Sequence, residues 1–164
     1  MSFESEFRKE REAVIAATEE VVRVTAFDAF NTAIVISPVG NPDLWVTQDS
    51  NGNYVDYIAY KGYPDGYVGG RFRSNWNLSF SGFDESTTDS VVSKQTKIGQ
   101  LQEVFTSPYT GFYSYTNSLP YAQRIDNGWS SQAPTGITEV VKLRAERQIP
   151  KFTKAAYKKY GVKD

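Results

Sequence analysis

The sequence predicts an α+β domain in which an antiparallel or mixed β-sheet is flanked by a long N-terminal helix and a C-terminal helix, with an aromatic-rich hairpin inserted at residues 40–68. Three observations carry this prediction. Apolar residues recur at spacings of three and four near both ends of the chain, as they do in amphipathic helices. The middle of the chain places short β-prone runs between clusters of Gly, Asn and Pro. A length of 164 residues is typical of one domain, so residues 1–164 are assigned to a single domain.

The first predicted helix spans about Phe3–Ile36, a segment without Gly or Pro that is rich in Glu, Arg and Ala. A helix of that span would be about 50 Å long at 1.5 Å per residue, which exceeds what a domain of this size needs to cover its core. We therefore expect part of it to pack on something else. The β-branched residues 34–36 leave open a shorter helix followed by a strand. The apolar stripe consists of Phe3, Phe7, Val14, Ala17, Val21, Val24, Phe27, Phe30 and Ile34.

The insertion begins where residues 37–43 bring two prolines and a Gly-Asn pair, which should end the helix. Residues 49–53 form a strong turn signal between two β-prone runs, residues 44–48 and 54–60, and together these predict a hairpin. Tyrosine is frequent here among Asn, Asp, Gly and Pro. A long aromatic and polar insertion is typical of a contact loop rather than of a core element.

The segments after the insertion predict the main sheet. Residues 71–80 alternate in polarity as a central strand would, with the aromatic Phe72 and Trp76 on the same face. Residues 111–116 predict a second strand, whereas residues 93–105 fit either a strand or a short helix. A short helix is expected to open at Pro120, because proline suits the first helical turn.

The last predicted helix runs from about Ile137 to Tyr160, with Thr135 or Thr138 as its N-cap and a kink at Pro150. Residues 142–164 hold eight Lys or Arg against two acidic residues, a balance of +6, whereas residues 1–20 hold six Glu against three basic residues, a balance of −3. Opposite charge predicts pairing of the two terminal helices, within one chain or between neighbours. Two solvated helix faces would give the same pattern.

Composition limits the functions that the chain can perform. It has no Cys and no His, which removes thiol nucleophiles, thiolate ligands and the side chain most used for metal binding and general base catalysis near neutral pH. We therefore expect no enzyme, no cofactor and no metal site. The net charge of −1, from 18 basic and 19 acidic residues, argues against tight nucleic-acid binding through the overall field. No apolar run approaches the roughly 18 residues that a membrane span needs.

Four segments carry motifs of a known family. Residues 37–39 (S-P-V), resumed after the insertion at residues 69–76 (G-G-R-F-R-S-N-W), match a pattern T-P-V-D-T-G-x-L-R-x-S-W. Residues 116–122 and 127–134 match N-x-x-P-Y-A and E-x-G-x-S-x-Q-A-P, although Asp126 and Asn127 stand where a Glu is usual. In motif order and spacing, the chain resembles the neck or tail-completion proteins of lambda-like long-tailed bacteriophages over nearly its whole length.

This resemblance implies a structural virion protein that is assembled in the host cytoplasm and located at the phage neck. Such subunits form a closed ring, usually a hexamer, between the head-completion or adaptor protein and the tail terminator or tail tube protein. The lumen passes the genome, so contact with DNA is transient and non-specific, and a net charge near zero suits a subunit that lets DNA slide. A ring of heterologous contacts needs two different contact surfaces on each subunit.

The long helix and the insertion could supply those two surfaces. Aromatic and arginine side chains dominate the residues that anchor interfaces. The alternative is a tyrosine-rich module of a phage tail that binds carbohydrate or a host surface, because aspartates lie among the tyrosines of the insertion as they do in sugar-binding loops. The predicted interface residues are Trp45, Tyr54, Tyr57, Tyr67, Arg71, Arg73, Tyr121, Arg124 and Trp129.

Overall fold

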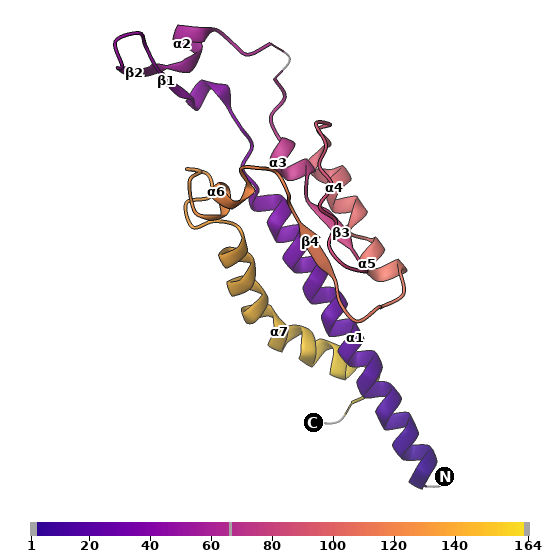
Figure 1. Ribbon diagram of the computed structural model, residues 1–164. Coiled ribbons are helices and arrows are strands. Elements are labelled where there is room, and N and C mark those ends of the chain that lie inside the picture. Colours follow the sequence, from indigo (N-terminus) through magenta and orange to yellow (C-terminus); the bar gives the residue numbers. More distant parts are fainter. Residues whose placement is uncertain (1–2, 66, 163–164) are drawn as a thin grey trace.

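A computed structural model describes residues 3–65 and 67–162 and has the predicted α+β class. Helix α1 (Phe3–Ile36) is the longest element, with α7 (Thr138–Tyr160) on one side of it, α4 (Lys94–Gln100) and α5 (Glu103–Thr106) on the other side, and β1 (Val46–Gln48), β2 (Tyr54–Asp56) and α2 (Tyr57–Lys61) beyond its C-terminal end (Figure 1). None of the helices in the described ranges has the length and apolar character of a membrane span. The remaining elements are η1 (Pro42–Leu44), α3 (Arg71–Ser74), β3 (Asn77–Ser79), β4 (Ser114–Thr116) and α6 (Ala122–Asp126).

Helices α1 and α7 form an antiparallel pair. The Arg144 guanidinium donates two hydrogen bonds of 2.8 Å to the Asp28 carboxylate, and Lys159 Nζ donates one of 2.8 Å to Glu20 Oε1. The predicted pairing of the acidic segment 1–20 with α7 is therefore confirmed within one chain only at Glu20, because Asp28 lies outside that segment. Ala17 and Ala156 are both buried, and their small side chains let the helices approach closely. Pro150 lies inside α7, which bows away from α1 in its middle (Figure 1), because proline lacks the N–H of a helical hydrogen bond.

Helix α1 is longer than its partner. It continues to Ile36, so the open possibility of a strand at residues 34–36 is wrong. At its other end, α7 finishes near Glu20, and about four turns of α1 extend beyond it (Figure 1). No residue from 3 to 16 is buried, and Phe3 and Phe7 are 84% and 60% exposed. This part of the helix extends beyond the core, and the expectation that it packs on something else stays a prediction.

The hydrophobic core lies at the C-terminal end of α1, between α3, α6 and the start of α7. Trp76 stacks on Tyr115 with ring centroids 5.2 Å apart, and Tyr115 also stacks on Phe30 at 4.5 Å. Burial raises the pKa of the Tyr115 phenol, which therefore stays neutral. The buried members of this core are Ala33, Phe72, Leu119, Ala133 and Ile137.

The predicted single sheet is divided into two separate antiparallel pairs. Strand β1 pairs with β2 inside the insertion, where Thr47 lies opposite Val55. Strand β3 pairs with β4, where Leu78 lies opposite Tyr115. The elements of the insertion pack mainly on one another, so their hairpin does not join the second pair.

The predicted strand over residues 71–80 is wrong in its first half, because residues Arg71–Ser74 form the short helix α3 and only Asn77–Ser79 is strand. Gly70 precedes α3 with φ +111°, a left-handed conformation that glycine adopts easily. The side chains of Ser74 and Asn75 then hydrogen-bond the carbonyl oxygens of Gly70 and Arg71, which favours a helical turn.

Helices also occur in one predicted β-prone run and in the segment that fitted either a strand or a short helix. The second half of the hairpin run, residues 57–60, belongs to α2, because Asp56 Oδ1 accepts a hydrogen bond of 2.8 Å from Ala59 N and caps a helical turn. The ambiguous segment 93–105 contains α4 and α5, and Ser93 Oγ accepts from Thr96 N at 3.0 Å to cap α4. The turn at residues 49–53 is confirmed, with Asp49 Oδ1 accepting from Asn51 N and Asn53 N.

The start of α7 is capped from outside its own sequence. Neither Thr135 nor Thr138 caps it, contrary to the prediction. Instead, Asp126 Oδ1 accepts hydrogen bonds from Ile137 N at 2.9 Å and Thr138 N at 2.7 Å. Burial pushes the pKa of Asp126 upward, but the hydrogen bonds from Thr138 and Ile137 outweigh it and hold the pKa below its ordinary value of 3.8.

Replacing Asp126 by alanine should lower the free energy of unfolding by about 1 kcal/mol at neutral pH, because two helix N–H groups lose their acceptor. The native pKa lies below the unfolded one, so the stabilisation by Asp126 is complete above pH 3.8 and is lost as pH falls through the native pKa. Urea unfolding at neutral and acidic pH measures both effects. Asp126→Asn is the control, because it keeps an acceptor oxygen but cannot titrate. If Asp126→Ala lowered the free energy of unfolding equally at neutral and at acidic pH, the assignment of the Asp126 carboxylate as the cap of α7 would be wrong.

Candidate contact surface at the base of the insertion

The two ends of the insertion lie side by side. A Cβ atom built on Gly69 would be 2.6 Å from the Gly40 carbonyl oxygen and 2.8 Å from Val39 Cγ1, so only glycine permits this approach. The Gln132 side chain fixes the backbone of Val39 at this contact. Its Oε1 accepts a hydrogen bond from Val39 N at 3.1 Å, and its Nε2 donates one to Val39 O at 2.8 Å. The insertion therefore leaves and re-enters the rest of the molecule through one narrow base.

The two halves of the interrupted motif meet directly beneath this base. Arg73 Nε donates to Ile34 O at 3.1 Å, and its Nη2 donates to Ser37 O at 3.3 Å. Trp76 Nε1 donates to Ser37 Oγ at 2.8 Å. The last turn of α1 has no basic side chain, so Arg73 supplies both donors and positive charge to a helix C-terminus that lacks them.

A groove with a volume of about 560 Å³ lies between the insertion, α3 and α6. Five of the nine predicted interface residues line it, drawn from segments that are up to 84 residues apart in the sequence. Aromatic rings and polar groups form its walls in similar measure, a composition common in binding surfaces. The predicted residues that line the groove are Trp45, Tyr67, Arg71, Tyr121 and Trp129.

Trp45 is held in the groove wall by two tyrosines. Tyr57 and Tyr67 each meet its ring edge-on, with centroids 5.3 and 5.0 Å away. A Cβ atom on Gly40 would lie 1.9 Å from Tyr67 Oη, so the position of Tyr67 also depends on glycine. These packed rings give the insertion a defined surface, as aromatic pairs of this geometry do.

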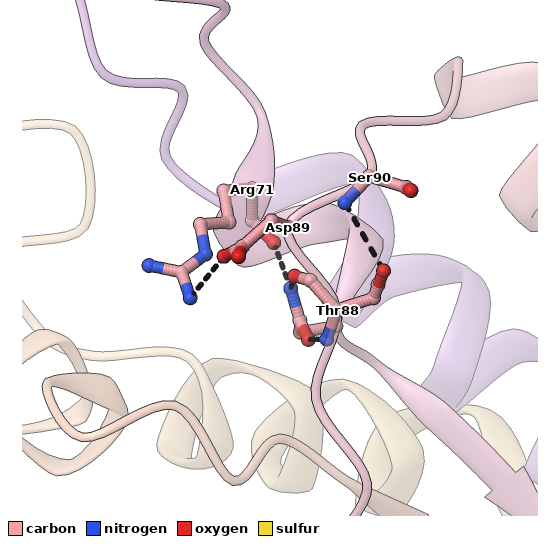
Figure 2. Close-up of polar contacts among 5 residues, drawn as sticks. Arg71, Thr88, Asp89 and Ser90 are labelled. Carbon is pink, nitrogen blue, oxygen red and sulfur yellow. Dashed lines mark hydrogen bonds and ion pairs between the residues drawn. The ribbon is translucent and has the colours of Figure 1, made fainter.

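Arg71 stands at the rim of the groove and pairs with Asp89 at 2.6 Å (Figure 2). The buried Asn75 places this partner, because its Nδ2 donates to Arg71 O and Thr88 O while its Oδ1 accepts from Thr88 N. The ion pair is exposed, so the guanidinium can exchange Asp89 for an acidic partner at small cost.

Trp129 is the most open aromatic residue of the groove, with 76% of its surface exposed. The Arg124 guanidinium lies over its ring, 5.4 Å from the centroid, which is a cation–π contact. An exposed tryptophan beside an arginine is the kind of anchor that dominates the binding energy of interfaces.

The remaining predicted residues lie elsewhere. Tyr54 is 77% exposed on β2 and lies outside this groove. Tyr57 supports Trp45, and the guanidinium of Arg73 is bound inside the chain to the end of α1. The prediction missed Gln132, which lines the groove and holds Val39 at its base. It also missed Asn75, which positions the loop that carries the partner of Arg71. The only sequence signal for Gln132 was its place in the Q-A-P motif, and Asn75 was assigned to a strand face.

The titratable side chains of the groove suit it for binding through hydrogen bonds and ring contacts. Burial, followed by the neighbouring Tyr63, raises the pKa of Tyr67, and burial raises that of Tyr121 against the opposing charge of Arg71. Both phenols therefore remain neutral and present hydroxyl groups and ring faces. Within residues 3–65 and 67–162, no group of three or more carboxylates gathers around a possible metal position.

Deleting residues 40–68 and joining Val39 to Gly69 should leave a folded protein, because the two ends already touch and a shorter loop is easier to close. We expect cooperative unfolding with a free energy within about 2 kcal/mol of the wild type. A variant with a Gly/Ser linker of equal length in place of residues 41–68 is the control, because it keeps the length of the connection but removes the side chains of the insertion. Failure of the deletion variant to fold, measured by circular dichroism, would place the insertion in the core.

Comparison with protein-family models, with curated proteins and with solved structures finds no match to this chain.

Proposed function

We propose that this chain is a structural subunit of a bacteriophage virion that forms a closed ring at the neck. The ring joins the head-completion or adaptor protein on one side to the tail terminator or tail tube protein on the other. The genome passes through its lumen with transient, non-specific contact. In this proposal the protein has no catalytic role and becomes functional only as an oligomer.

One observation carries the proposal: the molecule has two different unpartnered surfaces at opposite ends. The aromatic groove lies between the insertion, α3 and α6, at the C-terminal end of α1, whereas the exposed Phe3 and Phe7 belong to the N-terminal turns of that helix. A monomer gains nothing from a helix that extends four turns past its core, since that segment buries no apolar residue. A subunit that must join both its neighbours and its head or tail partner in a ring needs more than one such surface.

A measurement of molar mass tests the ring. Light scattering coupled to size-exclusion chromatography should give a hexamer, for the protein alone or after mixing with its head-side or tail-side partner. The deletion of residues 40–68 serves as a control, because it should abolish partner binding without unfolding the chain. A protein that stays monomeric with every neck and tail protein of its phage would remove the proposal.

The alternative is a carbohydrate-binding or host-surface-binding module of the tail. The openness of Trp129 favours it, because an exposed indole beside Ser130 and Gln132 can stack on a sugar ring and leave polar groups for its hydroxyls. The packing of Trp45 between Tyr57 and Tyr67 disfavours it, because the two tyrosine rings already contact the indole on which a sugar would have to stack.

Glycan-array binding separates the two proposals. The ring proposal predicts no glycan bound by the wild type at micromolar protein. Specific binding that is lost in both Trp129→Ala and Trp45→Ala, while Tyr54→Ala binds normally, would favour the carbohydrate module. Tyr54 is a suitable control because it is exposed on the same insertion but lies outside the groove.

A further inference from the structure

The N-terminal extension, defined as residues 3–16 of α1, has an apolar stripe with one acidic edge. Phe3 and Phe7 stack with ring centroids 6.4 Å apart, and Val14 continues their row. Glu6 is three residues from Phe3, and Glu10 is three from Phe7 and four from Val14, so both acids lie beside the stripe on one helix edge. The opposite edge carries Glu4 and Arg11, whose charges cancel.

This surface continues the face on which α1 already binds a helix. The residues of α1 that meet α7 include Asp28, Val24, Glu20 and Ala17, at steps of four, four and three. The same steps of three and four lead on to residues 13, 10, 6 and 3. On this face, Asp28 and Glu20 lie opposite the cations Arg144 and Lys159 of α7. Glu10 and Glu6 hold equivalent positions farther along α1, beyond the end of α7. The extension is therefore suited to a basic helix that resembles α7.

The outer face of α7 is such a surface. Four cations recur on it at steps of four, three and four, which places them in one row along the helix. All four are exposed, and no ion pair within the described ranges involves them. The flanking cations Arg144 and Lys159 are the ones already paired with α1. The row consists of Arg147, Lys151, Lys154 and Lys158.

The cationic row borders a hollow that can receive aromatic rings. A groove of about 630 Å³ lies along the C-terminal half of α7. Lys154 and Lys158 line it together with Pro150, Tyr157 and Val162. Lys154 and Lys158 are four residues apart, as are Glu6 and Glu10, so both pairs are spaced about 6 Å along their helices.

We propose that the N-terminal extension of one copy of this chain docks on the outer face of α7 of the next copy. Phe3 and Phe7 enter the groove at Pro150, Tyr157 and Val162, and Glu6 and Glu10 lie opposite Lys154 and Lys158. The contact joins two different surfaces, so it propagates from copy to copy and can close into a ring. This inference rests on the proposed ring and names the surfaces through which neighbours meet.

Charge reversal tests the contact. Glu6→Lys with Glu10→Lys gives one variant, and Lys154→Glu with Lys158→Glu gives another. Each variant alone should associate on the order of 100-fold more weakly than the wild type, because like charges face each other. A 1:1 mixture of the two should assemble again, because every junction in an alternating ring then joins opposite charges. Misfolding could not produce that recovery in the mixture.

Matched controls are Lys9→Glu and Lys142→Glu, which reverse charges on the same two helices away from the stripe and the cationic row, and which should assemble normally. Assembly of both double variants at wild-type strength would overturn the docking contact while leaving the ring intact. A Lys154→Glu/Lys158→Glu variant that assembles normally but loses affinity for duplex DNA would assign the row to nucleic acid instead. Absence of assembly in the wild type with every partner would overturn the ring itself, together with this contact.

Discussion

The end of helix α1 is the constraint on which the rest of the structure depends. Its last carbonyl groups have no basic side chain nearby in sequence, and Arg73 reaches them from beyond the insertion while Trp76 fixes Ser37. This closure brings residues 37 and 73 together, which forces the chain between them to the outside of the molecule. The groove follows from that arrangement, since its walls come from the insertion on one side and from α3 and α6 on the other.

The sequence predicted best what depends on long periodic patterns. A stripe sustained over twenty or more residues has few structural alternatives, so α1 and α7 were found with their ends within one residue. The segment at residues 71–76 was mistaken because Phe72 and Trp76, four apart, share a face in a strand and also in a helical turn. The choice between the two was made by side-chain hydrogen bonds of Ser74 and Asn75 to the backbone, which no periodicity reveals.

The candidate contact surface was predicted only in part, because composition indicates which residues are exposed but not which of them lie together. Aromatic residues in a polar insertion indicate exposure, and five of the predicted residues do line the groove. Arginine is ambiguous, because Arg71 stands at the surface whereas Arg73, two residues later, serves a helix end. The contributions of Gln132 and Asp126 depend on contacts across 93 and 11 residues, and such contacts follow only from the folded chain.

The narrow base of the insertion has an evolutionary consequence. Because Gly40 and Gly69 already touch, the entropy of closing the intervening loop rises only slowly with its length. Relatives of this chain can therefore lengthen, shorten or exchange that lobe without refolding the scaffold that supports it. The surface at that end of the molecule can diversify while the opposite end is kept unchanged.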